Sequence, residues 1–276
     1  MYGESVEGAL TGMIVPQSIT ALLIAGRRPG VDPLAQHFGV EDKALIAVAG
    51  EAMLSRVAQT LTSHPAIRRV MILAQEPEHL IAAIPWMQEH PAIVTRAGGS
   101  SVSEAVADAI ADNNDAFPFL LTSADNALLD HGMIDSFVES AARHELAVGV
   151  VERRVLLAAH PRNRRTWLKF RGGAWSGANL FWFGDPKVAQ VLALWRTIEQ
   201  ERKRGRAVIR AFGPLMLAGV ALRLLSIQQA VGIAGRRFGL DATAVSLPFA
   251  EACIDVDSIA DHRTVEAILK QREATA

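Results

Sequence analysis

The sequence contains very little cysteine and almost no net charge. Cys253 is the single cysteine among 276 residues, which excludes an internal disulfide framework and any zinc site of paired cysteines. A net charge of −1 at pH 7 gives no overall field that would favour DNA or RNA as a partner. Six histidines show no spacing typical of metal ligands and receive no role: His37, His64, His79, His131, His144 and His160. The near-absence of cysteine predicts a protein of a reducing cytoplasm.

The chain also lacks a recognisable leader and a long uninterrupted apolar run. Residues 1–17 have neither a basic start nor an apolar core, so we expect no signal peptide and a loose N-terminal segment. The most apolar stretch, 212–240, is interrupted by Arg223, Gln228 and Gln229. It therefore falls short of the roughly 20 apolar residues that a membrane-spanning helix needs.

Two interpretations of this apolar stretch stay open. In the first, it forms a pair of packed helices. In the second, a helix lies on a membrane surface, where upstream basic residues contact anionic lipid; these residues are Arg202, Lys203, Arg204, Arg206 and Arg210. We expect a cytoplasmic protein, with peripheral contact to the inner face of a membrane through 202–233 as the open alternative.

Short apolar runs alternate with longer segments of helical periodicity, which is the pattern of βαβ units and a mostly parallel sheet. The expected strands are 19–26, 69–75, 92–96, 117–125, 146–152, 166–170, 178–183 and a last strand at about 251–257. The expected helices are 51–62, 77–84, 101–112, 132–143 and a C-terminal helix from Ile259. We therefore predict a single α/β domain over 1–276, with a helical, apolar and basic insertion at 185–240 before the last strand.

The first expected strand ends in an unusual loop. Gly26, Arg27 and Arg28 follow the apolar run directly, and Lys43 comes before the next one. Backbone N–H groups of a glycine turn can approach phosphate oxygens closely, and arginine matches them with its forked donors. The glycine spacing fits neither a Rossmann fingerprint nor a Walker loop. Taken alone, the loop is either a phosphate cradle or an ordinary charged turn.

Two further strand ends carry carboxylates, at the edge of an α/β sheet where ligands bind. Asp125 follows the run FPFLLTSA, where an aspartate either caps or turns the chain or binds a hard divalent cation. Asp255 and Asp257 lie at the end of the expected last strand, and we expect only one of them to face the cleft with Asp125. Asp257 also suits the N-cap of the last helix, with Asp261 in its first turn.

In this order, the three segments resemble the nucleotidyltransferases of the molybdenum-cofactor and sugar-nucleotide type (MobA-like NTP transferases), over about residues 19–270. The motifs read LLIAGRRPG…DKALIAVAGEAML, TSADNALL and IDVDSIADHRTV. The resemblance implies a GT-A-type, Rossmann-like α/β fold. The sequence departs from the family's pattern at Arg27, where a second glycine is usual, at Ala127 in place of proline, and at Ser258 and Ile259 in place of Thr-Pro. None of these changes removes a charged group that the chemistry needs.

The resemblance also implies roles for individual residues. Arg27 and Lys43 would hold the outer phosphates of an NTP, while Asp125 and Asp257 would bind Mg²⁺ or Mn²⁺. These four are the expected catalytic residues. The expected nucleotide-binding residues are Ala25, Gly26, Arg27, Arg28, Lys43, Gly98, Gly99 and Ser100.

The base, the ribose and the acceptor are assigned by the same resemblance. Glycines at 98–99 would let the backbone approach the base, and this is compatible with Ser101 and Glu104 forming a capping box for the next helix. The segment 162–183 is strongly basic, which suits a phosphorylated acceptor, with a solvated hairpin as the alternative. The expected acceptor-binding residues are Lys169, Arg171, Gly177 and Asn179.

By this resemblance the chain is predicted to transfer a nucleoside monophosphate from an NTP to a phosphorylated small-molecule or lipid-linked acceptor, releasing pyrophosphate. CTP or GTP is the favoured nucleotide. Two alternatives stay open. One is a GT-A glycosyltransferase that uses a sugar nucleotide, although its usual Asp-x-Asp is absent because Ser123 and Ala124 precede Asp125. The other is a non-catalytic nucleotide-binding or membrane-surface protein.

Overall fold

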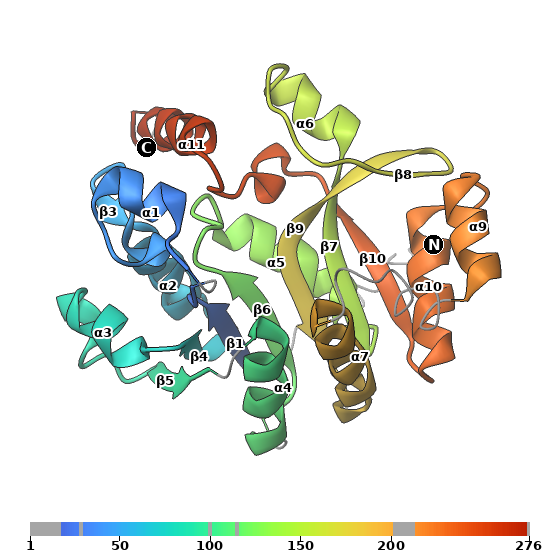
Figure 1. Ribbon diagram of the computed structural model, residues 1–276, viewed down its shortest axis with the longest axis horizontal. Coiled ribbons are helices and arrows are strands. Elements are labelled where there is room, and N and C mark those ends of the chain that lie inside the picture. Colours follow the sequence, from blue (N-terminus) through green and yellow to red (C-terminus); the bar gives the residue numbers. More distant parts are fainter. Residues whose placement is uncertain (1–17, 28–29, 99–100, 114–115, 201–212, 275–276) are drawn as a thin grey trace, which may run out of the picture.

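A mixed, mostly parallel sheet forms the centre of the molecule (Figure 1). The computed structural model describes residues 18–27, 30–98, 101–113, 116–200 and 213–274. The strands are ordered β10-β7-β9-β6-β1-β4-β5, and β8 pairs with β9 off this path. Their bounds are β1 Ile19–Ile24, β4 Ile67–Ala74, β5 Ile93–Ala97, β6 Phe119–Ser123, β7 Leu146–Glu152, β8 Leu168–Phe170, β9 Gly173–Phe183 and β10 Ala242–Leu247.

Parallel pairing dominates both halves of the sheet. On one side β6, β1, β4 and β5 run parallel, and on the other β10 runs parallel to β7. The long strand β9 joins the two halves, because it pairs antiparallel with both β6 and β7. The predicted Rossmann-like, GT-A-type α/β fold is confirmed. A second sheet of two short strands, β2 Ala47–Val48 and β3 Glu51–Ala52, lies outside this arrangement.

Helices cover both faces of the sheet (Figure 1). They are α1 Pro33–Phe38, α2 Met53–Ser63, α3 Pro77–Ala82, α4 Val102–Asp112, α5 His131–Ala141, α6 Arg153–Ala159, α7 Ala189–Gln200, α9 Pro214–Ala221, α10 Ile227–Arg237 and α11 Ile259–Glu273. Neighbouring residues of β1 belong to opposite layers: Leu23 packs in the larger core cluster and Leu22 in the second one. A strand covered on both faces must be apolar at every position, which explains its continuous hydrophobic run.

The prediction of the last strand was wrong. Residues 250–253 form a short 3₁₀ helix, and the chain then runs without regular pairing to Ser258. The last strand is β10, which ends just before Pro248, a residue that cannot donate to a ladder. Ile254 and Val256 are nevertheless fully buried. Their apolar character reflects packing against the core and was misread as strand pairing.

The part of the chain from 185 to 240 is helical where the structure describes it. α10 packs on β10 and also contacts α9, so a pair of packed helices is present. No helix in the described ranges is long and apolar enough to cross a membrane. Several residues of the sequence predictions lie outside the described ranges: 1–17, Arg28, Gly99, Ser100 and the basic cluster at 202–210.

Candidate active site

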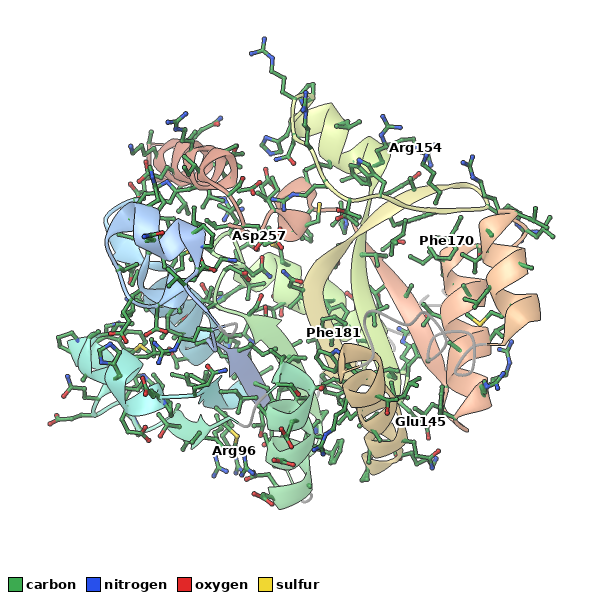
Figure 2. All side chains as sticks on the ribbon, viewed as in Figure 1. Arg96, Glu145, Arg154, Phe170, Phe181 and Asp257 are labelled. Atoms are coloured by element: carbon green, nitrogen blue, oxygen red, sulfur yellow. The ribbon has the colours of Figure 1, made fainter. Side chains whose placement is uncertain are left out.

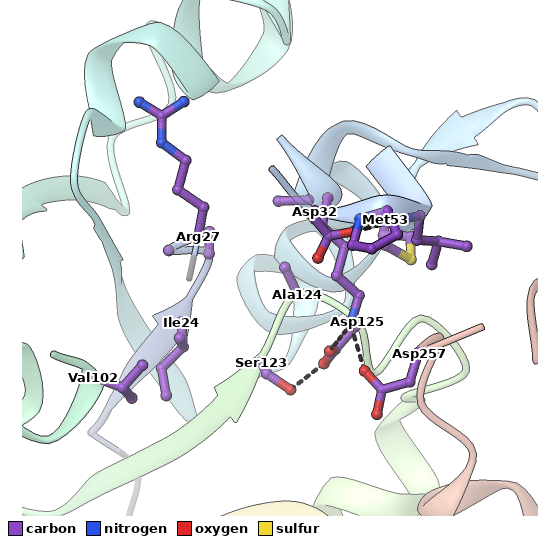
Figure 3. A pocket seen from close by; sticks show the side chains of 15 residues that line it. Ile24, Arg27, Asp32, Met53, Val102, Ser123, Ala124, Asp125 and Asp257 are labelled. Carbon is purple, nitrogen blue, oxygen red and sulfur yellow. Dashed lines mark hydrogen bonds and ion pairs between the residues drawn. The ribbon is translucent and has the colours of Figure 1, made fainter. Parts of the chain in front are cut away.

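A cavity of about 510 Å³ opens where β1 and β6 end (Figure 3). This is the carboxyl edge of the parallel strands, where α/β proteins bind their ligands. Its wall combines the end of β1 and the loop after it with residues from six other segments of the chain. The charged and polar residues that line it are Arg27, Asp32, Lys43, Ser123, Asp125 and Asp257.

Lys43 joins the two carboxylates that the sequence singled out. Its Nζ donates to Asp125 Oδ2 at 2.7 Å and to Asp257 Oδ1 at 2.6 Å. Burial lowers the pKa of Lys43, but attraction to Asp125 and Asp257 outweighs burial and raises the pKa above its usual value. Lys43 is therefore charged at neutral pH. One cation thus holds together two carboxylates that lie 132 positions apart in the sequence.

Backbone contacts fix the positions of both carboxylates. Ala124 N donates to Ile24 O at 2.8 Å, which ties the end of β6 to β1. Val256 N donates to Asp125 O at 3.1 Å, which brings the next residue, Asp257, beside the same strand end. Ser123 Oγ donates to Asp125 Oδ1 at 2.5 Å and orients that carboxylate (Figure 3). The pair is therefore held by the sheet and not by the lysine alone.

Asp255 points elsewhere, into a clamp formed by Arg165. Arg165 pairs with the Asp255 carboxylate, donates to Asp255 O at 2.9 Å and reaches Asp261 Oδ1 at 3.2 Å. Asn179 Nδ2 donates to Asp255 Oδ2 at 3.3 Å. Burial raises the pKa of Asp255; Arg165 lowers it, and the nearby Asp257 and Asp125 raise it further. Only Asp257 lines the cavity with Asp125.

Arg27 lines the cavity but directs its guanidinium away from the two aspartates (Figure 3). It pairs with Glu41 at 3.1 Å and with Glu76 at 2.9 Å. The loop itself is anchored by Gln75, which accepts from Arg27 N at 2.9 Å and donates to Arg27 O at 3.0 Å. A Cβ on Gly26 would lie 3.0 Å from Gln75 Oε1, so a larger residue here would push against the side chain that anchors the loop. The arrangement gives no direct support to the phosphate contact expected of Arg27.

A smaller hollow of about 20 Å³ lies beside the main cavity, between the loop after β1 and the start of α4. Gly98, expected near the base, lines it together with Gln75 and Ser101. Ser101 caps α4 by accepting from Glu104 N at 3.2 Å, which is one of the two bonds of the predicted capping box. The Glu104 carboxylate also pairs with Arg196 at 2.6 Å.

Comparison with known families settles what kind of protein has this fold and cavity. Residues 23–214 match the model of the MobA-like NTP transferase domain. The chain belongs to this family. It is accordingly a nucleotidyltransferase, and the matched region contains Lys43 and Asp125, whereas Asp257 lies beyond it. No protein of curated function matches the chain by sequence.

Solved structures show the same fold over most of this MobA-like protein. A hypothetical transferase from Thermus thermophilus is 24% identical, with a TM-score of 0.72 over 89% of this chain and 99% of its own. A 4-diphosphocytidyl-2C-methyl-D-erythritol synthase from Anaerococcus prevotii is 9% identical, with a TM-score of 0.58 over 94% and 98%. A CMP:2-keto-3-deoxy-manno-octonic acid synthetase complexed with CTP is 11% identical, with a TM-score of 0.55 over 92% and 99%.

The expected acceptor residues of this MobA-like enzyme do not gather in one place. None of Lys169, Arg171, Gly177 and Asn179 lines the cavity. Asn179 lies closest to the aspartates through its bond to Asp255, with a left-handed backbone φ of 49°. Lys169 pairs across the hairpin with Ala174, five positions before Asn179, which is roughly 16 Å along an extended strand. Lys169 and Arg171 therefore belong to a different surface from Asn179.

Four residues that shape the site were missed by the sequence reasoning. Asp32 caps α1 by accepting from Leu34 N and Ala35 N at the cavity wall. Ser123 orients Asp125, Gln75 anchors the loop after β1, and Arg165 holds the segment that carries Asp257. A signal existed only for Asp32, because an aspartate before proline at the first helical position is typical of a helix start.

Proposed function

We propose that this enzyme transfers a nucleoside monophosphate from an NTP to a phosphorylated acceptor in a reaction that depends on Mg²⁺ or Mn²⁺. An oxygen of the acceptor phosphate forms a bond to the α-phosphorus, the α–β bridging bond breaks, and pyrophosphate leaves with the electron pair. The observation that carries the proposal is the convergence of Asp125, Asp257 and Lys43 at the edge of a strand-end cavity. The chain supplies no covalent nucleophile in this mechanism, only positioning and charge.

The two aspartates fit a hard divalent cation. Oxygens of both carboxylates already lie within hydrogen-bond distance of one positive nitrogen, so they are directed at a single cation position. No group of three or more histidine, cysteine, aspartate or glutamate side chains in the described ranges could hold a metal ion. The two carboxylates alone form a donor set that suits Mg²⁺, which is commonly held by one or two carboxylates together with water and substrate phosphates. When bound, the ion would neutralise charge on the phosphates.

Lys43 has a second task in this proposal. Its ammonium binds the two carboxylates in the nucleotide-free structure, and we assign it to the outer phosphates when an NTP is present. The flexible four-carbon stem allows the charged head to move while the backbone stays in place. The backbone at Gly26 and the loop anchored by Gln75 border the same cavity and would approach the phosphates. Arg27 can join them only by leaving Glu41 and Glu76.

CTP is the nucleotide to test first and GTP the second. The synthetase above was solved with CTP, and the Anaerococcus prevotii protein is described as a diphosphocytidyl-methylerythritol synthase. The acceptor class in the proposal is a phosphorylated small molecule or a lipid-linked phosphate. The site does not favour the glycosyltransferase alternative, because Ser123 stands where that class needs a second carboxylate and instead donates to Asp125.

Pyrophosphate release tests the proposal. The protein is incubated with each of CTP, GTP, ATP and UTP, with Mg²⁺, and with a panel of sugar, polyol and lipid-linked phosphates. We expect the wild type to release pyrophosphate with one nucleotide and at least one acceptor. Release should be lost in Asp125→Asn and retained in Asp108→Asn, because Asp108 is an exposed residue of α4 outside the cavity. The proposal is contradicted if the folded wild type releases no pyrophosphate with any nucleotide and acceptor of the panel. It is also contradicted if the protein consumes a sugar nucleotide in place of an NTP.

A further inference from the structure

Three exposed leucines gather where β8 meets the turn between α9 and α10. Leu168 of β8 is 54% exposed, and Leu222 and Leu224 after α9 are 70% and 60% exposed. α9 packs against β8, and Arg171 N donates to Leu225 O at 2.8 Å, so the two segments are joined (Figure 1). We call this region, Leu168–Arg171 with 216–224, the β8–α9 surface. It lies at the edge of the molecule, near Phe170 in Figure 2.

The helix within this surface is apolar on every side yet poorly buried. α9 reads PLMLAGVA and contains no polar side chain. A helix that is hydrophobic all round is normally enclosed by protein or by lipid. None of its described side chains is buried: Met216, Leu217 and Val220 are only half-buried, and both alanines are exposed. A contiguous apolar region of this kind marks an interaction site.

The charge around the leucines is positive. Lys169, Arg171 and Arg223 are all exposed on the same surface. The surface as defined, Leu168–Arg171 with 216–224, contains these three cations and no aspartate or glutamate. This concentration stands out in a chain whose net charge is only −1. The occupant of the surface should therefore combine negative charge with an apolar interior.

A second copy of the chain does not meet that requirement. A two-fold contact would place this surface against itself, bringing like charges together across an apolar centre. An anionic bilayer does meet it, because acidic headgroups lie above hydrocarbon that accepts leucine side chains. The described helices include none that could cross a membrane, so the contact would be peripheral.

We propose that the β8–α9 surface docks the enzyme on an anionic membrane. Leu168, Leu222 and Leu224 enter the headgroup region, while the exposed cations beside them contact acidic headgroups. The proposal reassigns Lys169 and Arg171, which the sequence resemblance placed at the acceptor. It is independent of the nucleotide site, because none of these residues lines the cavity.

Co-sedimentation of the full chain with vesicles tests this surface. The vesicles contain phosphatidylcholine with phosphatidylglycerol, or phosphatidylcholine alone, at about 20 mM and about 500 mM salt. We expect binding to the anionic vesicles at low salt and its loss at high salt. The double variant Leu222→Ser/Leu224→Ser should weaken partition roughly tenfold or more. The double variant Lys169→Gln/Arg223→Gln should weaken it by about fivefold per cation.

Matched control variants distinguish binding through this surface from nonspecific binding to vesicles. Val31→Ser removes an exposed apolar side chain elsewhere, and Arg263→Gln removes an exposed cation of α11; both should partition like the wild type. Unchanged melting temperatures establish that the variants fold. The proposal is overturned if the wild type stays in the supernatant with anionic vesicles at low salt, or if the leucine variant binds as well as the wild type. A wild-type dimer that the leucine variant dissociates, without vesicle binding, would assign the surface to a second copy.

Discussion

At the scale of single residues, the site depends on one ammonium group between two carboxylates. Lys43 lies within 2.7 Å of Asp125 and 2.6 Å of Asp257, and it offsets the repulsion between them. The sequence made the place of Asp125 predictable, because a carboxylate that follows a strand of a parallel sheet lies at the edge where ligands bind. Asp257 reaches the same edge from an irregular segment, through the bond from Val256 N to Asp125 O. The direction of the Arg27 side chain was not predictable, because it depends on Glu76, which tertiary structure brings from 49 positions away. The clamp of Arg165 on Asp255 depends likewise on residues 90 positions apart.

Replacing Lys43 should change metal and nucleotide binding in opposite directions. In Lys43→Met, Asp125 and Asp257 lose a competing cation, so Mn²⁺ affinity in the absence of nucleotide should rise by about tenfold. NTP affinity should fall far more than nucleoside monophosphate affinity, because the ammonium is assigned to the outer phosphates. Calorimetric titration measures both.

The exposed Lys270 supplies the matched control for this variant. Lys270→Met should leave Mn²⁺, NTP and monophosphate affinities unchanged, because Lys270 pairs only with Glu266 on α11 among the ion pairs of the described residues. Equal losses of NTP and monophosphate affinity in Lys43→Met, with unchanged Mn²⁺ binding, would place Lys43 outside the phosphate site.

At the scale of secondary-structure elements, the sequence predicted the inner strands well and the last strand badly. β1, β4, β6 and β7 are covered on both faces, so they read as continuous apolar runs. The segment after β10 is also apolar, but it is buried as a 3₁₀ turn and an irregular stretch. Strand geometry would place residues two apart on one face, so the predicted last strand would have turned both Asp255 and Asp257 the same way, against the expectation that only one of them faces the cleft. Asp255 and Asp257 diverge because this segment is not a strand.

Arg165 should be essential for holding that irregular segment. In Arg165→Met, the partly buried Asp255 loses its cation and lies near two other carboxylates, so the free energy of unfolding should fall by about 2–4 kcal/mol. Arg164→Met, at the exposed neighbouring position, should change it by less than about 0.5 kcal/mol. Urea unfolding compares the two variants. Similar urea midpoints for Arg165→Met and Arg164→Met would show that the Arg165 clamp contributes little to the stability of the protein.

The packing of α10 on β10 offers a second element-scale test. A Cβ on Gly235 would lie 2.4 Å from Ala242 Cβ, so Gly235→Ala should destabilise the protein by about 1–3 kcal/mol through overpacking. Gly232 is on the same helix, where an added Cβ meets nothing closer than 3.4 Å. Gly232→Ala should instead stabilise the protein by about 0.5–1 kcal/mol. If Gly235→Ala and Gly232→Ala shift the urea midpoint in the same direction by similar amounts, the described packing of α10 on β10 is contradicted.

At the scale of the whole molecule, the family and the GT-A-type fold could be predicted because three motifs occur in the right order over most of the chain. The β8–α9 surface could be predicted only in part. The apolar stretch after 212 was evident, but its contact with the β8 hairpin joins residues more than 50 positions apart. Sequence spacing carries no information about such a contact. The family resemblance assigned Lys169 and Arg171 to the acceptor, and the proposed membrane surface reassigns them.

The most direct test of the nucleotide site is the thermal stability of the protein with each NTP, with and without Mg²⁺. Binding to the native state must raise the melting temperature. We expect one of CTP, GTP, ATP and UTP to raise it more with Mg²⁺ than without, and this Mg²⁺-dependent increase to disappear in Asp257→Asn but persist in Asp108→Asn. An unchanged melting temperature of the wild type with all four nucleotides, or an increase that survives in both Asp125→Asn and Asp257→Asn, would contradict a nucleotide and metal site at this cavity.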